Sequence, residues 1–318
     1  MMNSNSITQN QVSLSDYVGN NQIKSIIQDN IDVCNKKGSA FPHTIIYGIS
    51  GTGKTTLARA IAASMNVHIE EVVCSKNINL LTTIIKLPDK SILFLDEIHS
   101  LDPSVMEYVL YNYMDSGIIF IKYPDGRTEP FELGREISII AATTEIDKIP
   151  TPLLNRFTLN LKLASYTHEE MIQILKLNLD NHLNITEDAY AALANATRYI
   201  PRHAIQYCNI IRNFALQHDL KAMDKSTMLK ALHNMGIDNY GLDSIDREYI
   251  TTLYNVFSNN PTGIKQLTSM LGESESTIVS RENHLIREKL IVRTSRGRML
   301  TPNGLRLAME MMNGSKRR

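Results

Sequence analysis

The chain has 318 residues, 43% of them hydrophobic, which is more than one ordinary core needs, so we expect two or three domains. Its 33 Lys and Arg balance 33 Asp and Glu, so the net charge identifies no nucleic-acid partner and any basic surface must be local. Three widely spaced cysteines support neither a disulfide framework nor a zinc site. The sequence shows no apolar run of membrane-spanning length and no signal peptide at its polar start, so we expect a cytoplasmic protein.

Between residues 17 and 166, four apolar runs alternate with segments of helical periodicity and are bounded by turn residues. They are HTIIYG (43–48), HIEEVVC (68–74), SILFLDE (91–97) and ISIIAATT (137–144). Nearly continuous apolar strands separated by helices predict an α/β fold with a parallel sheet that is covered on both faces.

Two further segments follow the predicted sheet. Residues 167–239 repeat apolar residues at helical spacing without a strand signal, which predicts a small helical domain. From residue 240 on, three helical patterns and the hairpin pattern LIVRTSRGRMLTP predict a winged helix. Residues 281–318 hold ten Lys and Arg against three Glu, a local net charge of +7. We therefore expect domains over residues 1–168, 169–239 and 240–318.

The stretch GISGTGKT, from Gly48 to Thr55, fits the phosphate-loop pattern GxxxxGK[ST]. Gly48, Gly51 and Gly53 would let backbone N–H groups wrap phosphates, and the following helix would point its positive end at the same anion. Lys54 can reach the β- and γ-phosphates of ATP, while the Thr55 hydroxyl can ligate Mg²⁺. A plain glycine turn is the alternative, but a strand before the loop and a helix after it favour the nucleotide site.

Two further strand ends supply polar groups for ATP hydrolysis. Asp96 ends the run SILFLDE, where open parallel sheets bind ligands, and we expect it to hold Mg²⁺ through water. Glu97 is the expected general base or orienter of the attacking water. Either Thr143 or Thr144, at the end of the next apolar run, could hydrogen-bond this water or the γ-phosphate, and the residues alone do not choose between them.

Hydrolysis also needs cations where charge moves during phosphoryl transfer. Two arginines downstream of the nucleotide motifs are candidates: Arg156 in TPLLNRF follows a proline-led turn, and Arg202 in YIPRHAIQY begins a helix of the second domain. Taken singly, either arginine could be an ordinary surface charge.

One combination of motifs resembles the AAA+ ATPases: GTGKTTLA, LFLDEIH, AATT, PLLNRF and IPRHA. The particular residues in these motifs resemble those of the RuvB family of Holliday-junction branch-migration motors. The resemblance runs from about Leu14 to Pro302 and includes LSDYVGNNQIK, GLDSIDREYI and IVRTSRGRMLTP. It implies an AAA+ domain, a helical lid and a winged helix in a hexameric ring. ATP and Mg²⁺ would be bound by Gly51, Lys54, Thr55 and Thr56, with Asp96 and Glu97 as the Walker B pair.

Further roles follow from the same resemblance. Thr144 would be sensor 1, and Arg156 would be the arginine finger, acting in the neighbouring subunit's site. Tyr166 and Arg202 would contact the nucleotide from the lid side, with Arg202 as sensor 2. Arg293 and Arg298, with Arg296 between them, match wing arginines that touch DNA phosphates.

The sequence departs from the family in four places. Asn10 and Gln11 replace an Arg-Pro pair that helps to hold adenine, which puts base selectivity in question. Ser100 and Glu145 stand where arginine is usual, which bears on subunit contacts.

Residues 116–135 predict a hairpin, because two apolar stretches flank the turn signal YPDGRT. In the family such a hairpin contacts a junction-binding partner. Its apolar residues could serve that docking or could pack on the protein's own sheet: Ile118, Ile119, Phe120 and Ile121.

These motifs predict an ATP-dependent, DNA-translocating motor that drives branch migration of four-way junctions. An AAA+ loader or initiator-type ATPase, which remodels a DNA-bound complex without branch migration, is the alternative. A winged helix at the end of the chain argues against a clamp loader, though initiators can carry one. A degenerate regulatory ATPase is disfavoured by the intact Lys54, Asp96, Glu97, Arg156 and Arg202.

Overall fold

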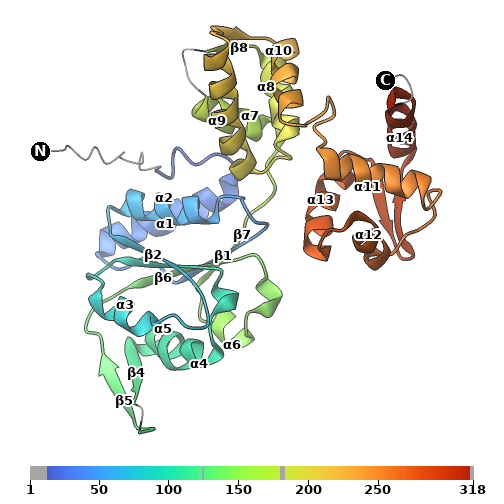
Figure 1. The fold of residues 1–318 in the computed structure, drawn as a ribbon. Coiled ribbons are helices and arrows are strands. Elements are labelled where there is room, and N and C mark those ends of the chain that lie inside the picture. Colours follow the sequence, from blue (N-terminus) through green and yellow to red (C-terminus); the bar gives the residue numbers. More distant parts are fainter. Residues whose placement is uncertain (1–12, 124, 180–182, 316–318) are drawn as a thin grey trace, which may run out of the picture. The chain divides into compact units, whose positions relative to one another are not determined.

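A computed structural model of the chain describes residues 13–123, 125–179 and 183–315. It divides into two compact units (Figure 1). The first runs to Ile174 and includes Ile200–Arg202; the second holds Leu175–Tyr199 and the chain from His203 on.

The first unit is built on a parallel sheet with strand order β2-β3-β6-β1-β7. Its strands are β1 (Thr44–Tyr47), β2 (Ile69–Val73), β3 (Ile92–Asp96), β6 (Ser138–Thr143) and β7 (Leu159–Lys162). The first four confirm the strands predicted from the apolar runs. Sequence reasoning missed β7, a half-exposed edge strand whose alternating LNLK pattern lacks a continuous apolar run.

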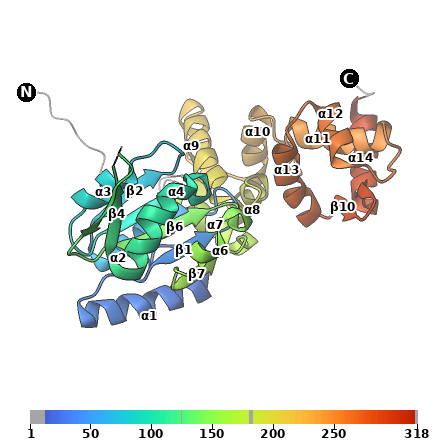
Figure 2. The same cartoon turned by 90° about the horizontal axis from the view of Figure 1, so that it is seen from below.

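Helices cover both faces of this sheet, as expected (Figure 1 and Figure 2). Helices α1 (Asn21–Lys37) and α2 (Lys54–Met65) lie on one face, where Ile46, Phe94 and Ile140 join their apolar cluster. The other face is covered by α3 (Leu80–Lys86), α4 (Pro103–Val105) and α5 (Asn112–Ser116). They pack on the strand residues next to those just named, whose side chains point to the opposite face of the sheet. Successive strand residues therefore feed two separate cores, as the period of two requires.

A π-helical turn, η2 (Met106–Tyr111), joins α4 to α5, and the chain then forms the hairpin of β4 (Ile118–Lys122) and β5 (Thr128–Glu132). This hairpin is a separate two-stranded sheet. Ile119 is buried in the core under α5, whereas every residue of β5 is exposed. The hairpin thus contributes Ile119 to the core of this unit, while its outer strand β5 stays exposed to solvent. Short turns complete the unit: η1 (Ile98–Ser100), η3 (Ile146–Lys148) and α6 (Thr151–Leu154).

Helix α7 (His168–Asn178) leads into the second unit, whose first part contains α8 (Glu187–Ala196), α9 (Pro201–Gln217) and α10 (Lys225–Asn234). The expectation of a strand-free segment is wrong in one detail. Two-residue strands β8 (Asn184–Ile185) and β9 (Ala222–Met223) pair in parallel ahead of α8 and α10. Such short pairings carry too few residues to show in an apolar pattern.

The last part of the chain is a winged helix, as expected. Helices α11 (Ser244–Asn255), α12 (Ile264–Leu271) and α13 (Glu275–Arg287) precede the wing strands β10 (Ile291–Thr294) and β11 (Gly297–Leu300), and α14 (Pro302–Ser315) closes the fold. Tyr249, Leu267 and Leu285 are fully buried in its core. Among the helices of the described residues, none is both long and apolar enough to cross a membrane.

The wing is tied to the rest of this domain through a backbone contact at Gly297. Arg298 and Thr262 exchange two backbone hydrogen bonds, of 2.9 and 3.0 Å. Gly297 has φ +140°, and a Cβ there would lie 2.5 Å from the carbonyl oxygen of Thr262.

We expect Gly297→Ala to destabilise the winged helix by at least about 3 kcal/mol, because both the backbone angle and the fixed Thr262 backbone oppose a side chain. Gly272→Ala is the matched control: its φ is +65°, but no atom lies within 4 Å of a built Cβ, so about 1 kcal/mol is expected. Hydrogen exchange of winged-helix amides in the full chain measures both. Equal losses would contradict the close-approach explanation.

A partly buried histidine makes the first unit sensitive to acid. Burial lowers the pKa of His43 from 6.5 to about 4, and its Nδ1 accepts the backbone N–H of Ile139 at 3.0 Å. The unfolded chain binds this proton below about pH 6.5 whereas the folded chain does not, so His43 adds stability above that pH that is lost as pH falls toward 4.

We therefore expect the free energy of unfolding of the first unit to fall by about 2 kcal/mol between pH 7 and pH 5 through His43. His43→Asn keeps an acceptor but cannot titrate, so it should flatten this dependence in thermal unfolding. His68→Asn alters a half-exposed histidine and should leave the dependence intact. A pH profile unchanged by His43→Asn would rule out this assignment.

Candidate functional site

The predicted phosphate loop lies between β1 and α2, as the motif requires. Gly48, Gly51 and Gly53 have φ values of 157°, 79° and 94°. The last two glycines are also closely approached, because a Cβ on Gly51 would lie 2.8 Å from Ile200 Cγ2 and one on Gly53 would lie 3.1 Å from Tyr17 Oη. Side chains at these positions would fill the concave loop, so glycine is needed for both conformation and space.

Lys54 begins α2, and its ammonium lies inside the loop. It donates to the carbonyl oxygens of Gly48 and Ile49 at 3.0 and 3.2 Å. Burial lowers the pKa of Lys54, while the carboxylates of Glu97 and Asp96 act in the opposite direction. Thr55 and Thr56 follow on the first turn of α2 and are partly buried. The loop therefore gathers a cation, a helix N-terminus and hydroxyl groups, which together suit a polyphosphate.

Asp96 and Glu97 lie at the carboxyl end of β3. Burial, followed by the neighbouring Glu97 carboxylate, raises the pKa of Asp96. Two adjacent carboxylates with hard oxygen donors fit Mg²⁺, which would offset the cost of holding both charges.

The structure distinguishes the two threonines at the end of β6. Thr144 donates both its backbone N–H and its hydroxyl to Glu97 Oε2, at 3.1 and 3.0 Å. Thr143 is fully buried, and its hydroxyl contacts His99 Nδ1 at 3.0 Å and the backbone N–H of Glu145. Thr144 thus orients the carboxylate, whereas Thr143 supports the turn behind it.

Sequence reasoning missed the part that His99 plays here. Its Nδ1 lies 3.2 Å from Glu97 Oε2, and its Nε2 lies 3.0 Å from Glu145 Oε2. Glu145 also pairs with Lys148 at 2.8 Å. Glu145, one of the four departures, is therefore part of the polar network around Glu97. Spacing could not reveal this, because His99 and Glu145 come from different strand ends.

Two tyrosines, Tyr17 and Tyr166, pack against the phosphate loop. Tyr166 Oη lies 3.0 Å from the carbonyl oxygen of Thr52 and 3.1 Å from Tyr17 Oη. Both rings are buried, and burial raises the pKa of both phenols. Tyr166 was a predicted site residue, whereas Tyr17 was not. Asn10 and Gln11, which bear on adenine selectivity, lie outside the described residues.

Arg202 also reaches the phosphate loop. Its Nη1 lies 3.3 Å from Ser50 Oγ, and its backbone N–H donates to the carbonyl of Gly51 at 3.3 Å. The segment Ile200–Arg202 belongs to the first unit, so these contacts lie within that unit.

Arg156 is held elsewhere in the first unit. Its Nε and Nη2 both donate to Asp115 Oδ2, at 3.0 and 2.7 Å, and its guanidinium lies 4.6 Å from the centre of the Tyr111 ring. Tyr111 ends the π-helical turn, which is a frequent device at functional sites. Within the described residues, the Arg156 side chain thus contacts Tyr111, Asp115 and the carbonyl of Pro152, and it makes no contact with the phosphate loop of the same chain.

The three wing arginines have different environments. Arg293 and Arg298 face each other across β10 and β11, and both donate to the fully buried carboxylate of Glu282, at 2.5 and 2.9 Å. Tyr249 donates to the same carboxylate at 3.0 Å. Arg296 is exposed at the turn between the strands and makes no side-chain hydrogen bond within the described residues.

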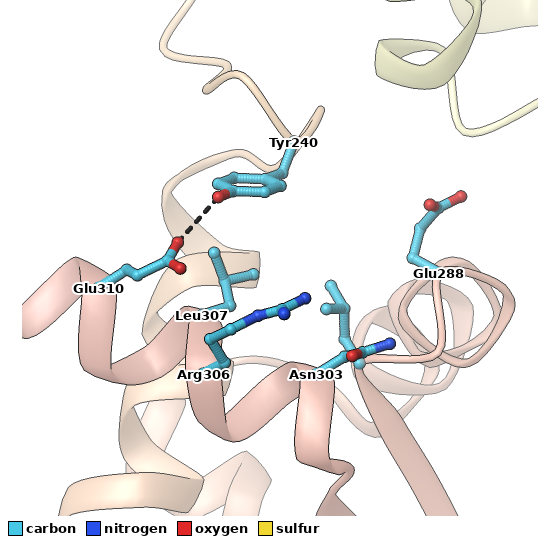
Figure 3. Close-up of a pocket in the computed structure, with 7 residues that line it drawn as sticks. Tyr240, Glu288, Asn303, Arg306, Leu307 and Glu310 are labelled. Atoms are coloured by element: carbon cyan, nitrogen blue, oxygen red, sulfur yellow. Dashed lines mark hydrogen bonds between the residues drawn. The ribbon is translucent and has the colours of Figure 1, made fainter.

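The winged helix also has a pocket of about 190 Å³, drawn in Figure 3. Its polar lining combines Arg306 with Glu288 and Glu310, and Tyr240 donates to Glu310 at 2.8 Å. These mixed charges differ from the converging cations of the phosphate loop.

Two segments of the chain match models of known protein families. Residues 10–163 match the model of the Holliday junction DNA helicase RuvB P-loop domain, and residues 239–308 match that of the RuvB C-terminal winged helix domain. The Holliday junction branch migration complex subunit RuvB of Orientia tsutsugamushi is 33% identical over 302 residues, covering 92% of each chain. That of Mesomycoplasma hyopneumoniae is 30% identical and covers 94% of this chain and 96% of its own.

Solved structures of RuvB proteins also resemble this chain in fold. The Holliday junction branch migration motor RuvB of Thermotoga maritima is 25% identical, with a TM-score of 0.77 over 94% of this chain and 97% of its own. Both family models match in order, and both relatives, at 30% identity or more, align over more than nine-tenths of their length, so this chain belongs to the RuvB family of AAA+ P-loop ATPases.

Proposed function

We propose that this chain is the ATPase subunit of a ring-shaped motor, most simply a hexamer, that drives branch migration of four-way DNA junctions. The observation that carries the proposal is the division of the site. The phosphate loop, Glu97, Thr144 and Arg202 meet in one unit, while Arg156 is held apart from them. Membership of the RuvB family, whose relatives are named branch migration complex subunits, supplies the substrate.

In this proposal, ATP takes the place of the carbonyl oxygens that Lys54 now contacts. Backbone N–H groups around Gly51 and Gly53, together with Thr56, would hold its phosphates, while Tyr166 and Arg202 approach from the opposite side. Thr55 and Asp96 would hold Mg²⁺, which when bound would neutralise charge on the phosphates. Both residues supply hard oxygen ligands, as this ion requires.

Glu97 is the proposed acceptor or orienter for the proton of the attacking water. Its Oε2 already accepts two hydrogen bonds from Thr144, so the carboxylate is fixed in direction before the substrate binds. Arg156 would leave Asp115 and enter the site of the neighbouring subunit, where it would stabilise the charge on the transferring phosphoryl group. Hydrolysis then requires a subunit contact, and this requirement couples chemistry to movement within the ring.

The wing is the proposed DNA contact. Arg296 is exposed at its tip, and the Arg293 side chain is 39% exposed, whereas that of Arg298 is only 18% exposed. Arginines that contact phosphates without reading base edges suit a motor that passes over any sequence.

The hairpin within residues 116–135 is the proposed docking site for a junction-binding partner. Its outer strand β5 is exposed throughout, and Phe131 is an exposed apolar side chain on it. Because the proposed substrate is junction DNA, we keep the expectation of a cytoplasmic location.

The proposal is tested with a synthetic four-way junction with homologous arms, ATP and Mg²⁺, with and without a candidate junction-binding protein. We expect ATP-dependent dissociation into duplex products. Hydrolysis of ATP that leaves junctions unmoved, with the partner present, would instead favour a loader or initiator-type ATPase.

Site sharing gives a second expectation. Lys54→Ala and Arg156→Ala should each lower kcat for ATP hydrolysis about a thousandfold, because one loses phosphate binding and the other the trans-acting cation. Mixing the two variants equally should restore activity, since about a quarter of the interfaces in a random ring would combine an intact loop with an intact finger.

Arg59→Ala is the matched control for this mixture. Arg59 also makes a two-pronged contact with a carboxylate, that of Glu71, at 2.5 and 2.7 Å. Its loss should leave turnover within about twofold, because exposed ion pairs contribute little. A mixture with no more activity than its separate components would contradict the shared site.

The wing arginines should also differ. Arg296→Ala is expected to weaken duplex binding for all sequences and to reduce the slope of log K against log salt by about 0.9, the loss of one phosphate contact. Arg298→Ala should mainly lower the unfolding temperature of the winged helix, because it leaves Glu282 buried with one cation fewer. Arg306→Ala removes an exposed arginine from α14 and serves as the charge-matched control. Equal slopes for Arg296→Ala and Arg306→Ala would contradict a contact at the wing tip.

A further inference from the structure

The loop between α8 and α9 contains two consecutive residues in left-handed backbone conformation. Arg198 has φ 56° and Tyr199 has φ 58°, although neither is glycine or asparagine. This conformation is unfavourable for residues with large side chains and persists only where the surroundings impose it. The contacts of these two side chains explain what imposes it.

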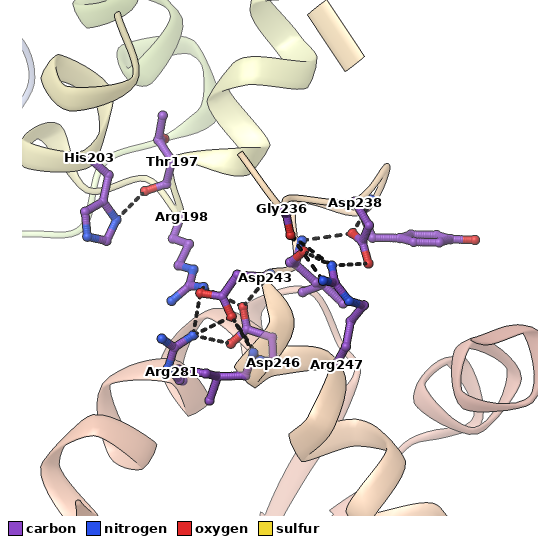
Figure 4. Close-up of polar contacts among 12 residues, drawn as sticks. Thr197, Arg198, His203, Gly236, Asp238, Asp243, Asp246, Arg247 and Arg281 are labelled. Atoms are coloured by element: carbon purple, nitrogen blue, oxygen red, sulfur yellow. Dashed lines mark hydrogen bonds and ion pairs between the residues drawn. The ribbon is translucent and has the colours of Figure 1, made fainter. Parts of the chain in front are cut away.

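Arg198 is bound to the start of the winged helix. Its Nη2 donates to Asp243 Oδ2 at 2.6 Å and to Asp246 Oδ2 at 2.5 Å (Figure 4). Asp243 caps α11, and Asp246 completes the capping box three residues later. One arginine of the lid loop therefore holds the first turn of the DNA-binding domain, and both lie within the second unit.

A second arginine closes this cluster from α13. Arg281 Nη1 lies 2.7 Å from Asp243 Oδ2 and 3.1 Å from Asp246 Oδ1. The cluster thus has two cations and two carboxylates. The Asp246 side chain is fully buried, and those of Arg198 and Arg281 are only 13% and 14% exposed. Buried ion clusters add little stability compared with apolar packing, and their best-attested use is to fix one arrangement among several.

Tyr199 adds a second connection to α13. The guanidinium of Arg287 lies 3.6 Å from the centre of its ring, and Tyr199 Oη lies 2.7 Å from Asn195 Oδ1. Between Arg281 and Arg287 on the same helix, His284 is buried, with both ring nitrogens lacking a hydrogen-bond partner in the described structure. Burial, then the nearby Arg198 and Arg287, lower the pKa of His284 to about 4, so it stays neutral at pH 7.

The same loop continues directly into the nucleotide site. Ile200, Pro201 and Arg202 belong to the first unit, where Ile200 and Arg202 pack on Gly51 of the phosphate loop. Only three residues separate Arg198 from Arg202 in the sequence. A displacement of Arg202 is therefore passed along a short backbone segment whose next side chains are fixed to the winged helix.

We propose that Arg198 is the positioning residue that couples the nucleotide state to the DNA-binding domain. It acts through the cluster with Asp243, Asp246 and Arg281, and it touches neither ATP nor DNA in this account. The inference rests on the proposed function of Arg202 as a nucleotide contact. It adds how the winged helix follows that contact.

The test measures a linkage rather than activity alone. Duplex DNA affinity of the full chain is compared with Mg²⁺ and a non-hydrolysable ATP analogue, and with Mg²⁺ and ADP. If the two sites are coupled, the DNA affinities measured with the ATP analogue and with ADP must differ. For the wild type we expect the two affinities to differ by about tenfold. Arg198→Ala should reduce the ratio to below about threefold while preserving binding of the ATP analogue itself.

Arg247→Ala is the matched control. Arg247 lies on α11 and donates to the carbonyls of Gly236 and Leu242, and none of its hydrogen bonds or ion pairs in the described part of the chain reaches residues 197–200 (Figure 4). It should lower stability comparably and keep the wild-type affinity ratio. Arg198→Lys retains the charge on a flexible stem, so an intermediate ratio is expected. Thermal unfolding and oligomer mass are measured for each variant, so that misfolding or failed assembly is recognised.

Two results would overturn the proposal. One is an Arg198→Ala variant that folds, assembles and keeps the wild-type ratio; the other is a wild-type ratio of one, which leaves no coupling for Arg198 to carry. Junction movement by the wild type, assayed in parallel, tests the proposed function separately. Unmoved junctions combined with a ratio that depends on Arg198 would contradict branch migration and support the coupling.

Discussion

The strand order of the parallel sheet is the constraint on which the rest of the site depends. Because β1 pairs with β6, and β6 with β3, the carboxyl ends of three strands meet at one edge. The phosphate loop, the Asp96–Glu97 pair and Thr144 each follow one of these ends. Their convergence needs no long loop, since the hydrogen-bonded ladder fixes both register and direction. The groups that approach from elsewhere, Tyr17, Tyr166 and Arg202, then complete the enclosure of the phosphate loop.

A second theme is that four arginines with proposed roles are paired with carboxylates in the absence of any ligand. Arg156 is held by Asp115, Arg293 and Arg298 by Glu282, and Arg198 by two aspartates. A paired guanidinium has a defined position, so less conformational freedom is lost when it meets a phosphate. Arg296 has no such partner in the described residues and is exposed, which is why we propose it as the foremost DNA contact of the wing.

The sequence predicted much of the sheet and the phosphate loop, because apolar strand runs and glycine spacing are local signals. From the residues alone it could not separate Thr143 from Thr144, although the family resemblance pointed to Thr144, since their difference depends on Glu97, nearly fifty residues away. It missed β7, whose alternating pattern reflects a half-exposed edge. It also gave no sign that Glu282 binds two wing arginines or that His99 joins Glu97, because long-range pairing of charges leaves no periodic pattern.

The central claim is that one subunit does not contain a complete hydrolytic site. Specific ATPase activity, measured against chain concentration in parallel with oligomer mass, tests it most directly. We predict that monomers bind ATP but turn it over slowly, and that activity per chain rises in step with assembly, because Arg156 must come from a neighbour. Activity per chain that is the same for monomers and assembled rings would contradict the claim, since the chain would then supply every catalytic group from its own fold.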